Sequence, residues 1–203
     1  MIYEELYTYD NLLREKYGLI VGVDEAGRGP LVGPVAVCAV ILDPTSKYEW
    51  LNDSKKVSEK RRTVLYEEII NTCLAYHVEL VDNKTIDEMN ILAATMLGMK
   101  KCIDALKEYR PQMAIIDGNR APKCSVPTLC VVKGDAKSAS IAAASVIAKV
   151  TRDSFMIELS KKYPEYSFEK HKGYPTKEHY KAIKKYGITE YHRVSFLKTL
   201  ENH

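Results

Sequence analysis

Apolar residues along this chain follow two patterns, short β-branched runs and longer stretches with helical spacing. The short runs are bounded by Gly, Pro or Asp, which is typical of buried strands. They predict five strands, at Gly18–Val23, Val35–Leu42, Tyr76–Val81, Met113–Ile116 and Pro127–Val132. We expect the first strand to end at Asp24.

The longer stretches carry apolar residues three and four positions apart, as helices that cover a core do. They predict four helices, over about 58–73, 85–106, 138–161 and 177–186. Ser58 is a plausible N-cap, and Thr85-Ile86-Asp87-Glu88 has the form of a capping box that opens the second helix. Gly187 is placed to end the last one.

The order of these elements indicates the fold class. Strands joined by short connections are expected to be antiparallel, and strands separated by a helix to be parallel. We therefore expect an α/β fold with a mixed five-stranded sheet flanked by helices and a C-terminal helical extension. Residues 1–17 are read as a short N-terminal segment, and residues 18–203 as one domain that includes the C-terminal helices.

Composition adds the class of protein. Of the 203 residues, 46% are apolar and 28% are charged, as in globular domains. No apolar run approaches the roughly 20 residues that cross a bilayer, and the acidic N-terminal residues are unlike a signal peptide. The five cysteines include no C-x-x-C pair, so neither a zinc site nor a disulfide framework is indicated. We expect a soluble, cytoplasmic protein that does not associate with membranes.

The net charge of +3 is unevenly distributed. Residues 133–203 hold 14 Lys and Arg against 8 Asp and Glu, a net of +6, which leaves −3 for residues 1–132. This division suggests a carboxylate site beside a phosphate-binding surface, although a set of solvated lysine-rich helices explains it as well.

Three acidic residues share a position, because Asp24, Asp117 and Asp135 each follow a predicted strand. Sites in α/β sheets form at the carboxyl ends of strands, so these side chains can converge. Oxygen ligands without a His or Cys cluster suit a hard cation, Mg²⁺ or Mn²⁺. Glu25 joins them only if the backbone bends, because neighbouring strand residues point to opposite faces. Gly27 makes such a bend easy.

The run Gly27-Arg28-Gly29-Pro30 allows two interpretations. It can be a phosphate cradle, since glycine lets backbone amides approach a ligand and Arg28 adds a forked donor. It can equally be a tight turn between strands. No Lys-Ser or Lys-Thr completes a P-loop, so binding of a nucleoside triphosphate is not indicated.

Several basic residues and a tyrosine in a predicted loop suggest that the protein binds nucleic acid. Lys55, Lys133 and Lys172 are candidates for phosphate contacts, and Tyr174, between Gly and Pro, is a candidate for stacking on a sugar or base. The histidines at 171, 179 and 192 lack metal-ligand spacing and are read as structural or surface residues.

Taken together, the motifs resemble those of ribonuclease HII, the bacterial type 2 ribonuclease H family, in order from about Gly18 to Phe196. They are Asp24-Glu25-Ala26-Gly27-Arg28-Gly29-Pro30, Asp53-Ser54-Lys55-Lys56, Ile116-Asp117-Gly118-Asn119, Lys133-Gly134-Asp135-Ala136, Ile147-Ala148-Lys149-Val150-Thr151-Arg152-Asp153, His171-Lys172-Gly173-Tyr174-Pro175 and His192-Arg193-Val194-Ser195-Phe196.

The resemblance implies a ribonuclease H-like fold and an endonuclease that cuts the RNA strand of RNA–DNA hybrids and DNA with embedded ribonucleotides. It implies two divalent ions, Mg²⁺ or Mn²⁺, and products with 3′-hydroxyl and 5′-phosphate ends. The implied catalytic and metal-binding residues are Asp24, Glu25, Asp117 and Asp135. The implied substrate-binding residues are Gly27, Arg28, Gly29 and Tyr174, to which we add Ser54, Lys55, Lys133 and Lys172.

Two other functions stay open at this point. A different two-metal nuclease or strand-transfer enzyme on the same fold would share the carboxylates but not the Gly-Arg-Gly and Gly-Tyr-Pro motifs. A catalytically silent nucleic-acid-binding module would have little use for four carboxylates facing phosphate. We expect a monomer whose partner is the nucleic-acid duplex.

Overall fold

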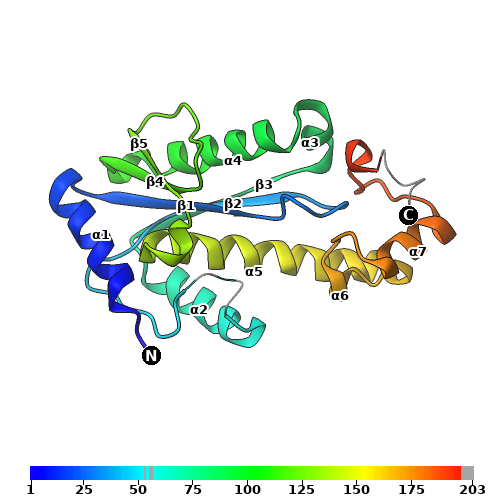
Figure 1. The fold of residues 1–203 in the computed structure, drawn as a ribbon, viewed down its shortest axis with the longest axis horizontal. Coiled ribbons are helices and arrows are strands. Elements are labelled where there is room, and N and C mark those ends of the chain that lie inside the picture. The colour runs from blue at the N-terminus through cyan, green and yellow to red at the C-terminus, as the bar shows by residue number, and fades with distance from the viewer. Residues whose placement is uncertain (53, 55–56, 198–203) are drawn as a thin grey trace.

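A mixed five-stranded sheet, in the order β3-β2-β1-β4-β5, forms the centre of the molecule (Figure 1). The computed structural model describes residues 1–52, 54 and 57–197. The strands are β1 (Ile20–Ala26), β2 (Val35–Ile41), β3 (Ala75–Val81), β4 (Met113–Asp117) and β5 (Thr128–Val131). All five predicted strands and the mixed sheet are confirmed.

Helices surround this sheet. The α-helices are α1 (Glu4–Tyr17), α2 (Glu59–Thr72), α3 (Asn83–Met89), α4 (Ile91–Ala105), α5 (Ala139–Lys162), α6 (Phe168–His171) and α7 (Lys177–Tyr186). Short 3₁₀ turns are η1 (Lys107–Tyr109), η2 (Gly134–Ala136), η3 (Pro164–Tyr166) and η4 (Val194–Phe196). The predicted ends of α7 agree with the structure, and those of α2 and α5 agree to within one residue.

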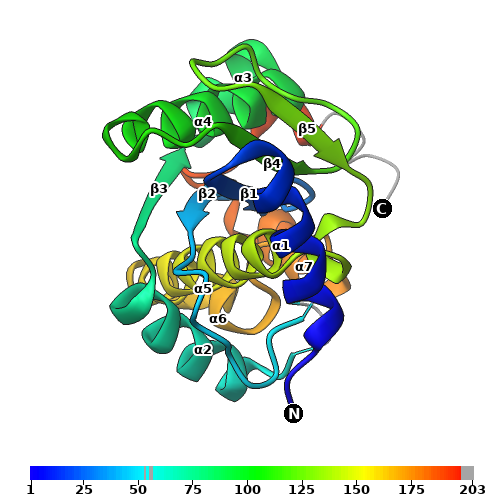
Figure 2. The same ribbon diagram turned by 90° about the vertical axis from the view of Figure 1, so that its left-hand side faces the viewer.

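The helices form layers on both faces of the sheet (Figures 1 and 2). On one face, Val23 and Ala39 share an apolar cluster with Met99 of α4. On the other face, Cys38 of β2 packs in a cluster with Ala143 of α5. The small alanine side chains at the start of α5 lie where the helix crosses the sheet closely. The last turns of α5 and helices α6 and α7 extend beyond the sheet as a C-terminal lobe.

The single helix predicted over 85–106 is wrong, because two helices occupy this stretch. Asp82, not Thr85, caps α3, and its carboxylate accepts a hydrogen bond from Thr85 N. The chain then turns at Asn90, whose φ of +72° is left-handed. The Asn90 side chain caps α4 by accepting from Leu92 N and Ala93 N. Asn is one of the best helix-capping residues, which explains why a new helix begins directly after Asn90.

Two of the expected strand directions are also wrong. β1 and β2 are antiparallel as expected, but β2 and β3 are antiparallel although a helix separates them. The chain leaves the end of β2, passes through α2 and starts β3 opposite Ile41, at the same end of the sheet. β3 must therefore run back along β2 in the opposite direction. β4 and β5 are parallel although only residues 118–127 join them, since ten extended residues can span so short a strand.

Residues 1–17, for which the pattern predicts no element, contain α1. Leu6 and Tyr7 of this helix are buried in the core beside α5. The buried Asp10 carboxylate accepts hydrogen bonds from Ser140 N and from the hydroxyls of Ser138 and Ser140 at the start of α5. Among the described residues, no helix has the length and apolar character needed to span a membrane.

Candidate active site

The four predicted carboxylates come from three separate segments and line one cavity of about 820 Å³. Asp24 and Glu25 lie near the end of β1, Asp117 is the last residue of β4, and Asp135 lies in η2. The parallel register pairs Val23 of β1 with Ile116 of β4, so the carboxyl ends of both strands reach the same edge.

The first strand continues past Asp24, contrary to expectation. Glu25 therefore reaches the site without the backbone bend that the sequence suggested. β1 stays paired with β2 as far as Ala26. Its pairing with β4 stops earlier, at Val23, which leaves one side of β1 open beside Asp24 and Glu25. Glu25 also borders a second hollow next to α4, which Asp117 shares. Two carboxylates on opposite faces of a strand can thus reach one site around its open edge.

Asp24 is the most buried of the four carboxylates, at 5% exposure. Burial, followed by the negative charges of Glu25 and Asp117, raises its pKa well above the usual value. Hydrogen bonds from the Ser145 hydroxyl and from Glu25 N act in the opposite direction. A cation beside Asp24 would relieve the repulsion between these like charges.

Asp117 and Glu25 each have a partner close by. Asp117 accepts a hydrogen bond from Gly134 N at 2.6 Å. A Cβ at Gly134 would lie 3.3 Å from that carboxylate and 2.6 Å from Ile141, so glycine permits the close approach. Glu25 pairs with Arg28 at 3.3 Å. Asp135, buried to 9% exposure, follows Gly134 directly.

The donor set fits hard divalent cations in kind, because carboxylate oxygens are the ligands that Mg²⁺ and Mn²⁺ prefer. Among residues 1–52, 54 and 57–197, however, no group of three Asp, Glu, His or Cys side chains is already gathered closely enough to hold a metal ion. The Glu25–Arg28 ion pair and the Gly134–Asp117 hydrogen bond occupy oxygens that a cation would use. The site is an open acidic cavity rather than a closed metal cage.

Most of the predicted substrate-binding residues line the same cavity, namely Gly27, Arg28, Gly29, Ser54 and Tyr174. Gly29 and Tyr174 are neighbours, since a Cβ on Gly29 would lie 3.6 Å from the Tyr174 ring. The Ser54 hydroxyl is 2.9 Å from that of Ser145, which in turn bonds Asp24. The turn and the tyrosine, separated by 145 positions in the sequence, therefore face one space.

The three predicted lysines are placed differently. Lys133 is exposed two positions before Asp135 but does not line the cavity. Lys172 lies outside it as well, with Nζ donating to the Glu169 carbonyl and pairing with Glu59 at 3.8 Å. Lys55 lies outside the described residues.

Two α5 residues that sequence reasoning did not place in the site also line the cavity, Ser145 and Lys149. Lys149 pairs with Asp153 at 2.7 Å. The signal was present in the four-residue spacing of 145, 149 and 153, which puts all three on one helix face. The Ala- and Ser-rich composition around Ser145 is typical of a helix that packs closely against a sheet, so by itself it does not indicate a site.

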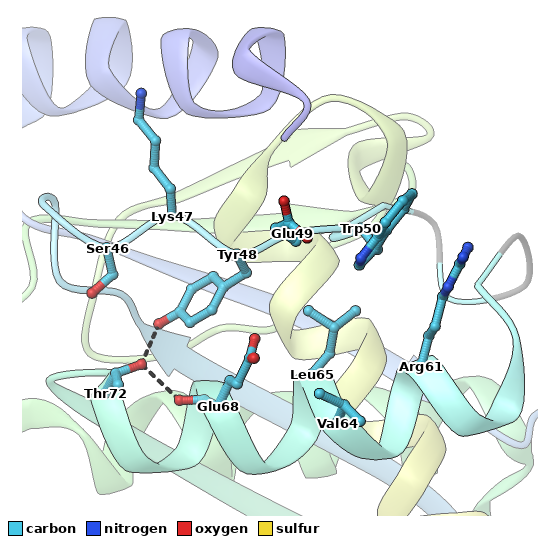
Figure 3. A pocket seen from close by; sticks show the side chains of 10 residues that line it. All are labelled: Ser46, Lys47, Tyr48, Glu49, Trp50, Arg61, Val64, Leu65, Glu68 and Thr72. Carbon is cyan, nitrogen blue, oxygen red and sulfur yellow. Dashed lines mark hydrogen bonds between the residues drawn. The ribbon is translucent and has the colours of Figure 1, made fainter. Parts of the chain in front are cut away.

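The connection that carries Ser54 is held by α2. Arg62 donates to the carbonyls of Ser54 and Val57, at 2.8 and 2.6 Å. On the outer side lies a separate hollow of about 580 Å³, where the Arg61 guanidinium lies 4.1 Å from the centre of the Trp50 ring (Figure 3).

Comparison with known proteins decides the family. The family model described as Ribonuclease HII matches residues 21–199. The chain belongs to the ribonuclease HII family. It is 53% identical over 191 residues to ribonuclease HII of Caldicellulosiruptor saccharolyticus, covering 94% of this chain and 93% of that protein. This ribonuclease HII is therefore a nuclease and a hydrolase.

Solved structures show the same fold. The crystal structure of ribonuclease H2 from Pyrococcus horikoshii OT3 has a TM-score of 0.71 and 28% identity, with 90% of this chain and 97% of that chain covered. The crystal structure of Bst-RNase HIII in complex with Mn²⁺ has a TM-score of 0.66 and 20% identity, with 83% and 63% covered. The predicted ribonuclease H-like fold is confirmed.

Proposed function

We propose that this ribonuclease HII hydrolyses the RNA strand of RNA–DNA hybrids and cuts duplex DNA on the 5′ side of an embedded ribonucleotide. One observation carries the proposal. Four carboxylates, the Gly27–Gly29 turn and Tyr174 line a single cavity, although they come from four separate segments of the chain. Chemistry at phosphate and recognition of a sugar can therefore act on the same nucleotide.

The four carboxylates would hold divalent cations, as the Mn²⁺ bound by Bst-RNase HIII suggests. We assign Asp24 to both of two cations, Glu25 and Asp117 to one, and Asp135 to the other. When bound, such ions supply an activated water and neutralise charge on the phosphate and the leaving oxygen. Hydrolysis would leave 3′-hydroxyl and 5′-phosphate ends.

The residues of the chain itself would place the substrate. Gly29 lacks a side chain at the mouth of the cavity, so a ribose can approach the backbone amides of the turn, where its 2′-hydroxyl distinguishes RNA from DNA. Tyr174, 41% exposed beside Gly29, would stack on the following deoxyribose. Arg28, paired with Glu25 in this structure, has a guanidinium suited to phosphate.

The decisive experiment uses a DNA duplex with one ribonucleotide, tested with Mg²⁺, with Mn²⁺ and with chelator. Asp24→Asn and Asp117→Asn remove charge without changing shape. Each is expected to lower the cleavage rate about a thousandfold or more, because several kcal/mol of transition-state stabilisation is lost. Duplex binding, measured by fluorescence anisotropy, is expected to survive.

An all-DNA duplex of the same sequence is the substrate control, and Asp43→Asn, a change at a partly exposed residue that does not line the cavity, is the enzyme control. Cleavage of the all-DNA duplex at the same rate would contradict the proposed specificity. Undiminished turnover by either active-site variant would contradict the assigned roles.

A further inference from the structure

Two arginines are completely buried between the carboxylate cavity and the C-terminal lobe. Arg152 lies on α5 and Arg193 follows α7, and both have 0% exposure. Burial lowers the pKa of Arg152 to about 10 and that of Arg193 to about 9, so both stay charged at neutral pH. Burying a charged side chain is unfavourable unless hydrogen bonds or opposite charges compensate for the lost water.

The hydrogen bonds of both guanidiniums go to main-chain carbonyls. Arg193 donates to Gly27 O at 2.7 Å, Arg28 O at 3.1 Å and Gly33 O at 2.9 Å. Arg152 donates to Val32 O at 3.1 Å, Pro34 O at 3.0 Å and Lys172 O at 3.0 Å. These carbonyls belong to two loops, the turn that contains Gly27–Gly29 and the loop that presents Tyr174.

The carbonyl contacts determine where the amides of the turn point. Across a trans peptide, the C=O and the next N–H point in opposite directions. Because the Gly27 and Arg28 carbonyls point inward to Arg193, the N–H groups of Arg28 and Gly29 point outward. Both residues are exposed there, beside the cavity.

Further contacts join the two loops into one unit. Leu31 N donates to Gly173 O, and Leu31 O accepts from Arg193 N. A Cβ on Gly27 would lie 2.0 Å from Arg152 Nε, so this glycine packs directly against the guanidinium. The Tyr174 ring centre lies 5.9 Å from the Arg152 guanidinium.

We propose that Arg152 and Arg193 are positioning residues for ribose recognition, which together hold the outward amides of Arg28 and Gly29 at a fixed distance from Tyr174. This inference rests on the proposed function, in which that turn and that tyrosine read the sugar. Neither arginine touches the substrate. The planar fork of arginine binds several carbonyls at once, whereas the ammonium of lysine is a point charge and cannot match it.

The test compares two duplexes that differ in one substituent, which is a 2′-hydroxyl or a 2′-fluorine on the single modified nucleotide. Fluorine is a poor acceptor for amide N–H groups. Single-turnover cleavage rates on both duplexes give a ratio that reports hydroxyl recognition apart from folding or metal binding. Arg193→Lys and Arg152→Lys keep the charge, and each is expected to lower this ratio at least tenfold, mainly by slowing cleavage of the hydroxyl duplex.

Arg14→Lys is the matched control, since this largely buried arginine on α1 pairs with Asp10 and touches neither loop. Its ratio is expected to equal that of the unaltered enzyme. If the lysine variants slow both duplexes equally, or fail to fold by circular dichroism, the arginines are structural only and the proposal is overturned. A failure of the proposed function looks different, because the unaltered enzyme would then show no preference for the hydroxyl.

Discussion

Because Gly22 has no side chain beyond a hydrogen atom, β1 and α5 can lie in direct contact. A Cβ at this position would lie 2.3 Å from the Ser140 carbonyl carbon and 2.4 Å from its oxygen. Ser140 is itself held by the buried Asp10 carboxylate. Because Asp24 follows Gly22 on the same face of β1, the spacing set here also sets the distance from Asp24 to Ser145.

We expect Gly22→Ala to lower the free energy of unfolding by about 3 kcal/mol or more, since two backbones would have to separate. Gly118→Ala is the comparison. No atom lies within 4 Å of that Cβ, but the φ of +100° adds strain of about 1 kcal/mol. Urea unfolding of both variants measures the difference. An equal or smaller loss for Gly22→Ala would show that the layers can adjust.

At the scale of elements, the C-terminal lobe contains a cluster of three histidines whose rings are in contact, His171, His179 and His192. His192 Nδ1 accepts from Thr189 N, so its Nε2 carries the proton and donates to His179 Nε2 at 3.3 Å. His179 Nδ1 donates in turn to Tyr174 O. His171 stacks on His179 with ring centres 4.6 Å apart. This arrangement agrees with the prediction that these histidines are structural. Through His179, they support the loop that presents Tyr174.

This histidine cluster predicts a loss of stability in mild acid. Burial lowers the pKa of His179 and of His192 to about 4, from an ordinary 6.5. The unfolded chain therefore binds more protons than the native state between these values, so stability is full above pH 6.5 and falls as the pH drops toward 4. The loss is on the order of 3 kcal/mol for each histidine.

Urea unfolding at pH 7.5 and 5 measures this loss. The double variant His179→Asn, His192→Asn is expected to be less stable at pH 7.5 and to lose less between the two pH values. His77→Asn, at a partly exposed position on β3, is expected to behave like the unaltered protein. A pH dependence that the double substitution leaves unchanged would contradict the assignment.

At the scale of the whole molecule, an acidic cavity lies beside a chain segment with a net charge of +6. Lys133 is exposed next to the cavity, and the α7 lysines at 177, 181 and 184 border a hollow with Tyr180. If the proposed function holds, these basic residues would bind the phosphate backbone of the duplex, while the acidic cavity stays available to cations.

Duplex affinity is therefore expected to fall steeply with added salt, because bound phosphates release counterions. Lys133→Ala is expected to weaken binding and to lower the slope of log affinity against log salt by about 1. Lys47→Ala, at an exposed lysine that lines the separate hollow beside α2, is expected to leave the slope unchanged. Anisotropy titrations over a range of salt concentrations measure both. An unchanged slope for Lys133→Ala would remove this residue from the binding surface.

The sequence by itself determined the elements whose signals are local. The spacing of apolar residues shows which face of a helix or strand is buried, so the five strands and most of α2, α5 and α7 were predicted. The order of short motifs also led to the right family and fold. The positions of Asp24, Asp117 and Asp135 after predicted strands indicated that these three side chains could converge, and the family resemblance added Glu25. All four line one cavity.

Only the tertiary structure decided the directions of β3 and β5, the break at Asn90 and the roles of Arg152 and Arg193. A strand's direction depends on where the preceding connection returns, and a buried arginine looks like any surface arginine until the carbonyls that it binds are brought around it. These features depend on contacts between residues far apart in the chain, and local patterning of hydrophobic and polar residues carries no information about such contacts.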